Sequence, residues 1–258
     1  QRREIRVLHS LSFIDDPTRA LRAVRYARRL GFEIASDTRN LIETALGEGV
    51  FERLSGQRLR RELEHLLAEP HPTPALALVA ELGLLSAISP ELAWTESVCN
   101  HLMEVEGQVA WYRLEKLGPE PEPWVLYLGG LALSAQPGAV NGLVRRLQLV
   151  GSYRGRFLAL PEEATRVVHA GEMDLPRSQR VRIVEGLSVE GLLLGMASLA
   201  LDERRAVADA VEAAVRVKPP VSGQQLLDGG VPPGPHVGRV LRLTRDALVD
   251  RVISEDEA

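Results

Sequence analysis

Residues 15–32 read DDPTRALRAVRYARRLGF, and this stretch predicts the fold class. Asp16 is a helix N-cap candidate directly before Pro17, which suits the first helical position. Gly31 suits the left-handed conformation that ends many helices. Between these signals apolar residues recur at helical spacing, so the stretch predicts one amphipathic helix.

The same signals recur along the chain. They predict further helices over 38–46, 57–69, 74–82, 91–117, 124–134, 138–149, 161–170, 176–186, 189–217 and 235–252. The helix over 189–217 is expected to break near Asp202, and Ser222 with Gln225 fits a capping box. No alternating pattern long enough for a strand is present. Aromatic residues are only 4% of the chain, which also favours helices. The sequence predicts an all-α fold.

Composition excludes several classes of protein. The chain has 258 residues, a net charge of −4 and a single cysteine, Cys99. One cysteine forms no internal disulfide, and no apolar run approaches the length of a membrane span, so we expect a cytoplasmic protein without a membrane segment. Residues 1–61 hold 13 arginines against 8 acidic residues, so a basic segment precedes an acidic remainder.

Four stretches resemble one known family in chain order. They are 5–32, the RLSGQRLRREL stretch at 53–63, ELGLL with PEL within 81–92, and SGQQLL with GVPPGPHVG within 222–238. Together they resemble class II tRNA nucleotidyltransferases, the CCA-adding and A-adding enzymes related to bacterial poly(A) polymerases. The resemblance implies an elongated multi-helix arrangement with a neck at 1–73 for recognition of the nucleotide base, a body at 74–150 and a tail at 151–258 for contact with tRNA.

The family's catalytic head carries a G-G/S-x-x-R-D turn and a D-x-D pair that holds two metal ions. Gly151 begins a partial match, but Gly155 stands where the aspartate belongs. The acidic run 255–257 is interpreted as a frayed end. We therefore expect that the head is missing from this chain, that the chain has no catalytic residue and no metal, and that it is inactive alone. The full enzyme would use Mg²⁺ with CTP or ATP.

The resemblance assigns nucleotide binding to the start of the neck helix. Asp16 and Arg19 are three positions apart and would share a face in the first helical turn. A carboxylate accepts from an exocyclic amine and a guanidinium donates to ring acceptors, so the pair can act like a base-pairing edge. Asp15 would support it. Alternatively, Asp16 is only a cap and Arg19 a solvated residue. Arg22, and after it Arg25 and Arg29, could meet the triphosphate or the RNA backbone, because arginine forks match phosphate geometry; the alternative is that they pair with acidic residues across the neck.

Two further groups of residues follow from the resemblance and from charge. Arg53, Arg58 and Glu62 are expected to form an ion network that braces the neck helix. A basic patch for RNA is expected to contain Arg145, Arg146, Tyr153, Arg154 and Arg156. Separately, the loop at Gly234 precedes a predicted helix whose N-terminus could hold a phosphate of tRNA. The alternatives are a solvated surface and a rigid turn.

The sequence thus predicts the nucleotide-selecting and tRNA-binding portion of an enzyme that adds CMP or AMP to tRNA 3′ ends. Its expected partners are CTP or ATP and the tRNA 3′ end with the acceptor and elbow region. One alternative is a catalytically inactive helical scaffold of the same ancestry that binds RNA or a protein. Another is one half of a split pair of CC-adding and A-adding enzymes.

Overall fold

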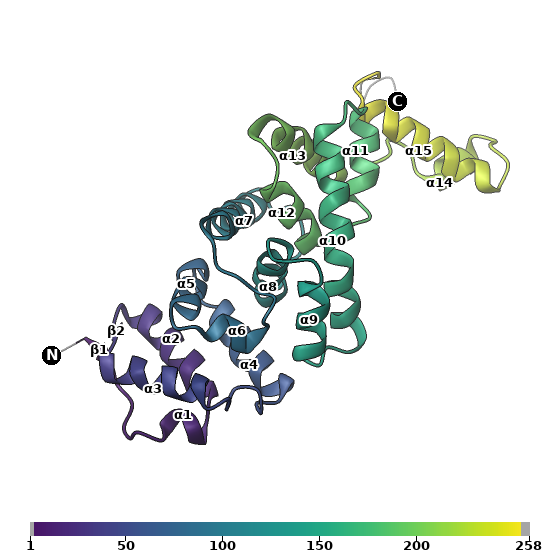
Figure 1. The fold of residues 1–258 in the computed structure, drawn as a ribbon. Helices are drawn as coiled ribbons and strands as arrows, with labels where there is room; N and C mark the ends of the chain where they lie inside the picture. The colour runs from purple at the N-terminus through teal and green to yellow at the C-terminus, as the bar shows by residue number, and fades with distance from the viewer. Residues whose placement is uncertain (1–2, 254–258) are drawn as a thin grey trace. The chain divides into compact units, whose positions relative to one another are not determined.

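The computed structural model describes residues 3–253, and that part of the chain consists almost entirely of helices (Figure 1). It contains fifteen helices and two strands of two residues each, so the all-α prediction is confirmed. Two compact units are present, Gln1–Gly107 with Pro121–Pro161, and Gln108–Glu120 with Glu162–Ala258. The expected division into neck, body and tail is a separate subdivision and stays a prediction.

The first unit begins with a short strand pair that the sequence did not predict. Strand β1 (Glu4–Ile5) pairs in parallel with β2 (Glu33–Ile34). A strand of two residues is too short to show an alternating pattern, so the sequence gives no signal for either strand. Helices α1 (Ser12–Asp15) and α2 (Thr18–Leu30) lie between the strands, and α3 (Ser36–Gly47) follows.

Helix α2 is the centre of this region. Its buried face includes Leu21 and Val24, and it packs against α4 (Gly56–Leu67) and α5 (Thr73–Glu81). Gly31 ends α2 with φ 63°, which confirms the predicted left-handed cap.

The remaining short helices of the first unit enclose a hydrophobic core. They are α6 (Leu84–Ile88), α8 (Pro123–Leu133) and α9 (Ala139–Arg146). Helix α8 is buried on almost every side and packs against α4 and α9. Its nearly uniform apolar sequence is typical of a helix that is buried all round.

Two long helices differ from their predicted bounds. Helix α7 (Glu96–Leu114) begins five residues late, because a turn in which Leu92 N–H donates to the carbonyl of Ser89 precedes it. Helix α10 (Gly151–Glu172) begins ten residues early and runs through Pro161, where the sequence predicts a start. Phe157 is fully buried within the early part, and this packing offsets the cost of an internal proline.

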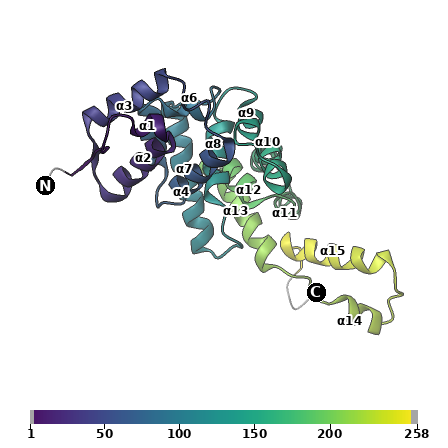
Figure 2. The same cartoon turned by 90° about the horizontal axis from the view of Figure 1, so that it is seen from below.

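The second unit contains five further helices, whose sequence bounds were largely predicted. They are α11 (Arg177–Val184), α12 (Val189–Ala197), α13 (Leu201–Arg216), α14 (Gly223–Asp228) and α15 (Pro235–Val249). The expected break near Asp202 is confirmed, as is the capping box of Ser222 and Gln225. Helices α14 and α15 lie side by side (Figures 1 and 2) and bury few side chains.

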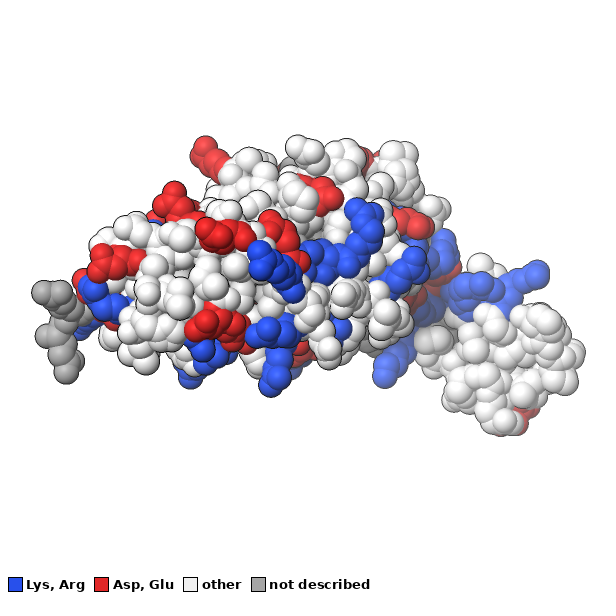
Figure 3. Space-filling model, turned by 60° about the horizontal axis from the view of Figure 1, so that its bottom comes forward, with Lys and Arg blue, Asp and Glu red and all other residues white. Residues whose placement is uncertain are grey.

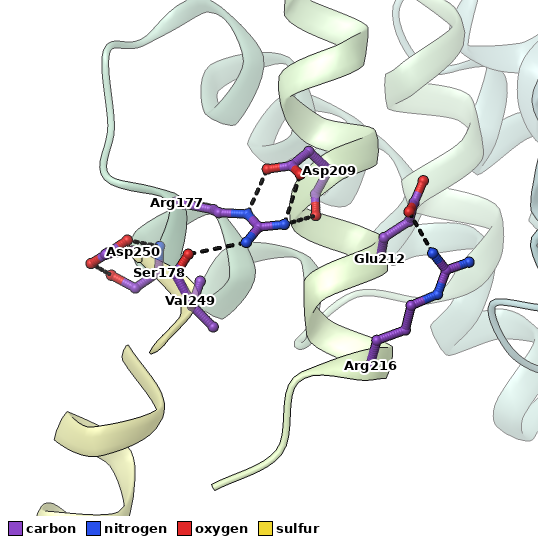
Figure 4. A network of polar contacts seen from close by, with 7 residues as sticks. All are labelled: Arg177, Ser178, Asp209, Glu212, Arg216, Val249 and Asp250. Carbon is purple, nitrogen blue, oxygen red and sulfur yellow. Dashed lines mark hydrogen bonds and ion pairs between the residues drawn. The ribbon is translucent and has the colours of Figure 1, made fainter. Parts of the chain in front are cut away.

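A polar network holds the end of α15 against α11 and α13 (Figure 4). Arg177 donates from Nε and Nη2 to the carboxylate of Asp209, over 2.5 and 2.7 Å, and from Nη1 to the carbonyl of Val249 over 3.1 Å. The N–H and hydroxyl of Ser178 both donate to Asp250 over 2.7 Å. These bonds join three helices around the buried Val249 side chain.

Candidate nucleotide and RNA site

Asp16 lies in the connection between α1 and α2, because α2 begins at Thr18. Its backbone is extended, with φ −147° and ψ 95°. A residue before proline is driven out of the helical region by the proline ring, and Pro17 follows here. Pro17 has helical dihedral angles, φ −59° and ψ −26°, and Asp16 Oδ1 accepts the N–H of Thr18, so Asp16 caps the start of the helix as predicted. That Asp16 and Arg19 act together on one base stays a prediction.

The carboxylate of Asp16 is held on one oxygen. Its Oδ1 accepts from the N–H of Thr18 at 3.1 Å, from the Thr18 hydroxyl at 2.6 Å and from Arg58 Nη2 at 2.9 Å. Within residues 3–253 no hydrogen bond reaches Oδ2, and the side chain is 24% exposed. The bonds to Oδ1 fix the orientation of the carboxylate and leave Oδ2 able to accept a further donor.

Arg19 is half-buried and anchored at one end. Its Nη1 donates to the carbonyl of Ser12 over 3.1 Å, whereas Nη2 and Nε have no partner among the described residues. Asp15 and Arg22, the other two expected nucleotide ligands, have exposed side chains. The structure thus places a fixed acceptor and fixed donors at the start of α2, with exposed charged groups beside them.

The three expected bracing residues do not contact one another. Arg58 pairs with Asp16, and Arg53 donates to the carbonyl of Glu48 over 3.4 Å. Glu62 is half-buried and makes no ion pair within the described part of the chain. The expected network therefore does not join these residues to one another, and Arg58 alone contacts the nucleotide motif.

Arg146, expected to contact RNA, is an internal anchor. Its Nη1 and Nη2 donate to the carbonyls of Leu54 and Phe51 over 3.0 and 2.9 Å. Burial lowers the pKa of its guanidinium. Arg145 is exposed, and its Nη2 lies 3.8 Å from Glu91 Oε1. Arg146 therefore joins α9 to the segment before α4.

Tyr153 and Arg156, also expected to contact RNA, belong to an aromatic and charged cluster. The Tyr153 hydroxyl and Trp124 Nε1 donate to Glu122 Oε1 over 2.7 and 2.8 Å, and Arg156 pairs with the other oxygen at 2.5 Å. The Cζ atoms of Arg60 and Arg156 lie 5.3 and 5.6 Å from the centre of the Tyr153 ring. These contacts favour a role in joining α4, α8 and α10 over stacking on a base.

The last two expected RNA residues, Arg154 and Gly234, are exposed and belong to different units. Arg154 projects from the first turns of α10. Gly234 precedes α15 with φ 152°, and a Cβ there would meet the His236 ring at 3.0 Å. Glycine is therefore required for this turn, whatever it binds.

Charge on this protein is mixed and locally grouped. Figure 3 shows basic side chains gathered in groups on one face, with acidic side chains between them. No continuous basic surface covers that face, so any contact with a nucleic acid depends on local clusters.

Comparisons with known proteins agree with the sequence motifs. Residues 31–95 match the family model described as the probable RNA and SrmB-binding site of polymerase A. The A-adding tRNA nucleotidyltransferase of Geobacter sulfurreducens is 36% identical over 248 residues, which are 93% of this chain and 28% of that protein. The chain belongs to the class II tRNA nucleotidyltransferase family.

Solved structures of CCA-adding enzymes share the fold. The Thermotoga maritima CCA-adding enzyme in complex with tRNA has a TM-score of 0.83 and 26% identity, covering 98% of this chain and 62% of that one. A CCA-adding enzyme in complex with ATP has a TM-score of 0.81 and 26% identity, covering 99% and 61%. The chain therefore spans less than two thirds of each of these relatives.

Some residues that shape the site were missing from the sequence prediction. Thr18 was not identified as a partner of Asp16, although a threonine two positions after an aspartate is a usual partner of that carboxylate. Arg60, Trp124 and Glu122 were also missed, because they meet only through the packing of α4, α8 and α10.

Proposed function

We propose that this chain is the nucleotide-selecting and tRNA-binding portion of a tRNA nucleotidyltransferase that adds CMP or AMP to tRNA 3′ ends. The observation that carries the proposal is the Asp16 carboxylate, held through Oδ1 by Thr18 and Arg58 with Oδ2 open. The guanidinium of Arg19 is anchored on the Ser12 carbonyl, which also accepts the N–H of Asp16. Family membership supports the reaction class.

The chemistry of this pair suits cytosine and adenine. Both bases carry an exocyclic amine beside a ring nitrogen that accepts a hydrogen bond. Asp16 Oδ2 would accept from the amine, and a free donor of Arg19 would reach the ring nitrogen. Uracil and guanine present a carbonyl oxygen and a ring N–H in these places, which would face the carboxylate and the guanidinium with the wrong polarity.

The cofactors of the transfer step are part of the proposal. The relative bound to ATP supports nucleotide use. Mg²⁺ finds no fitting site in residues 3–253, because no three His, Cys, Asp or Glu side chains there form a group able to hold a metal ion. We therefore expect this chain alone to be inactive and the full-length protein to supply the metal ligands.

Binding of the tRNA acceptor and elbow region is proposed for the body and tail. Among the expected RNA residues, Arg145 and Arg154 have exposed side chains that are available for phosphate contact. Within residues 3–253 no helix has the length and apolarity needed to cross a membrane. We propose a cytoplasmic location, where tRNA and nucleotides are present.

The test is nucleotide incorporation by the full-length protein with Arg19→Ala. We expect the variant to lose most of its preference for CTP and ATP over UTP and GTP while still folding. Arg61→Ala, an exposed arginine of α4, is the matched control and should keep the preference. Unchanged selectivity in Arg19→Ala would refute the assignment of Arg19.

A further inference from the structure

A pocket of about 650 Å³ lies within the first unit, away from the Asp16 motif. Its walls come from the last two turns of α2, the end of α4 and the start of α5. We name it the α2–α5 pocket. Its size is in the usual range for small-ligand sites.

Three guanidiniums line the α2–α5 pocket. They belong to Arg25, Arg28 and Arg29, and the only carboxylate in the lining is that of Glu69. Glu69 Oε1 lies 3.7 Å from Arg29 Nη1, a loose pair that leaves both groups partly hydrated. The pocket therefore carries an excess of positive charge, and the His71 ring adds a further polar group.

Two of these arginines have unused donors. Arg25 Nε is buried and has no hydrogen-bond partner. Arg28 is exposed, and its side chain makes no hydrogen bond or ion pair within the described residues. A buried donor without an acceptor costs roughly 1–3 kcal/mol, so Arg25 Nε favours any group that brings an acceptor within its reach.

The backbone at the start of α5 adds no donors. The N–H of Thr73 already donates to Glu106 Oε1 over 3.1 Å, and the N–H of Ala75 donates to the carbonyl of Pro72 over 2.9 Å. Pro74, between them, has no N–H. Anion binding in the pocket would therefore depend on the arginine side chains.

We propose that the α2–α5 pocket binds a phosphate group through Arg25, Arg28 and Arg29, and that a backbone phosphodiester of RNA supplies it. Guanidinium forks match phosphate geometry and keep their charge at every physiological pH. The choice of RNA as the source rests on the proposed function, whereas the phosphate chemistry rests on the pocket alone. The triphosphate of a nucleotide is the other possible source.

The experiment compares single variants of this 258-residue chain. Arg28→Gln removes a donor that has no structural contact, and Arg61→Gln, outside the pocket, is the control with the same loss of charge. Fluorescently labelled tRNA is titrated at several salt concentrations, and ATP is titrated in parallel. Inorganic phosphate is added to ¹⁵N-labelled protein while the arginine Nε–H resonances are observed.

We expect Arg28→Gln to weaken tRNA binding about tenfold and to lower the salt slope by about 1. Arg61→Gln should change the affinity by no more than about twofold. Arg28→Lys should retain part of the affinity, and Glu69→Gln should increase it because the opposing carboxylate is neutralised. Phosphate should shift the Arg25 and Arg28 resonances in the wild-type chain.

Two results would overturn the proposal: equal tRNA affinities for the Arg28→Gln and Arg61→Gln variants, or phosphate leaving both resonances unmoved. If ATP but not tRNA binding depends on Arg28, the source is a nucleotide and the RNA assignment is wrong. If the wild-type chain binds no tRNA at low salt, the proposed function loses its RNA part. The phosphate titration then still decides whether the pocket binds an anion.

Discussion

Arg58 donates from Nη2 to Oδ1 of Asp16 over 2.9 Å, and the two residues are 42 positions apart in sequence. This bond joins α4 to the connection before α2. It acts on the same oxygen as both bonds from Thr18, so three donors set the direction in which Oδ2 points. Arg58 is therefore a positioning residue for the proposed base-reading carboxylate.

Arg58→Ala tests that positioning role. The Arg58 side chain is 57% exposed, so its ion pair contributes no more than about 1 kcal/mol to the free energy of unfolding. We expect nearly unchanged urea unfolding of the chain, together with weaker preference for CTP and ATP in the full-length protein. Arg58→Lys should restore part of the preference. A large loss of stability with intact selectivity would show that Arg58 only braces the fold.

Tyr153→Phe separates a structural role of Tyr153 from base stacking. The variant keeps the ring but removes the hydroxyl that donates to Glu122, and we expect a loss of about 1 kcal/mol in unfolding free energy. Tyr153→Ala should cost more, since it also removes the contacts with Arg60 and Arg156. Arg154→Ala, at the exposed neighbour, should change stability by less than about 0.5 kcal/mol. Wild-type stability in Tyr153→Phe, measured by urea unfolding, would contradict the cluster's importance.

The partly buried His101 side chain should make the protein less stable in mild acid. Burial lowers the pKa of His101 below its ordinary value of 6.5, although Glu104 acts in the opposite direction. Between that value and the lower folded pKa, the unfolded chain binds a proton that the folded chain does not, so stability falls as the pH drops below 6.5. His101→Leu should reduce the pH dependence of the urea midpoint between about pH 5 and pH 8. The control is His65→Leu at an exposed position, which should leave the pH dependence of the urea midpoint unchanged. If wild type and His101→Leu show the same pH dependence, His101 is not its cause.

Gly56→Ala and Gly107→Ala should change stability in opposite directions. A Cβ at Gly56 would lie 2.4 Å from the carbonyl oxygen of Arg146, so we expect a loss of about 1–3 kcal/mol. A Cβ at Gly107 meets nothing within 4 Å, and alanine there should stabilise α7 by about 0.5–1 kcal/mol. Thermal unfolding of both variants is the measurement. A neutral Gly56→Ala would mean that α4 and α9 pack less closely than the structure shows.

Local signals in the sequence predicted most helix boundaries that caps define. Gly31 ends α2 as expected, and Ser55 accepts the N–H of Arg58 at the start of α4. Such signals act within one helical turn, so neighbouring residues are enough to read them. The start of α10 was mispredicted because the burial of Phe157 outweighs the local preference of Pro161.

The sequence by itself determined the all-α class, the family and the Asp16 and Arg19 motif, because helical periodicity, caps and motif spacing are local properties of the chain. Only the tertiary structure decided which atoms remain free to bind. It pairs Asp16 with Arg58, engages Tyr153 and Arg146 inside the first unit, and leaves Arg25 Nε without a partner. The sequence does not show whether an arginine guanidinium bonds to a backbone carbonyl or faces solvent. The packing of helices that are distant in the sequence decides which of the two occurs.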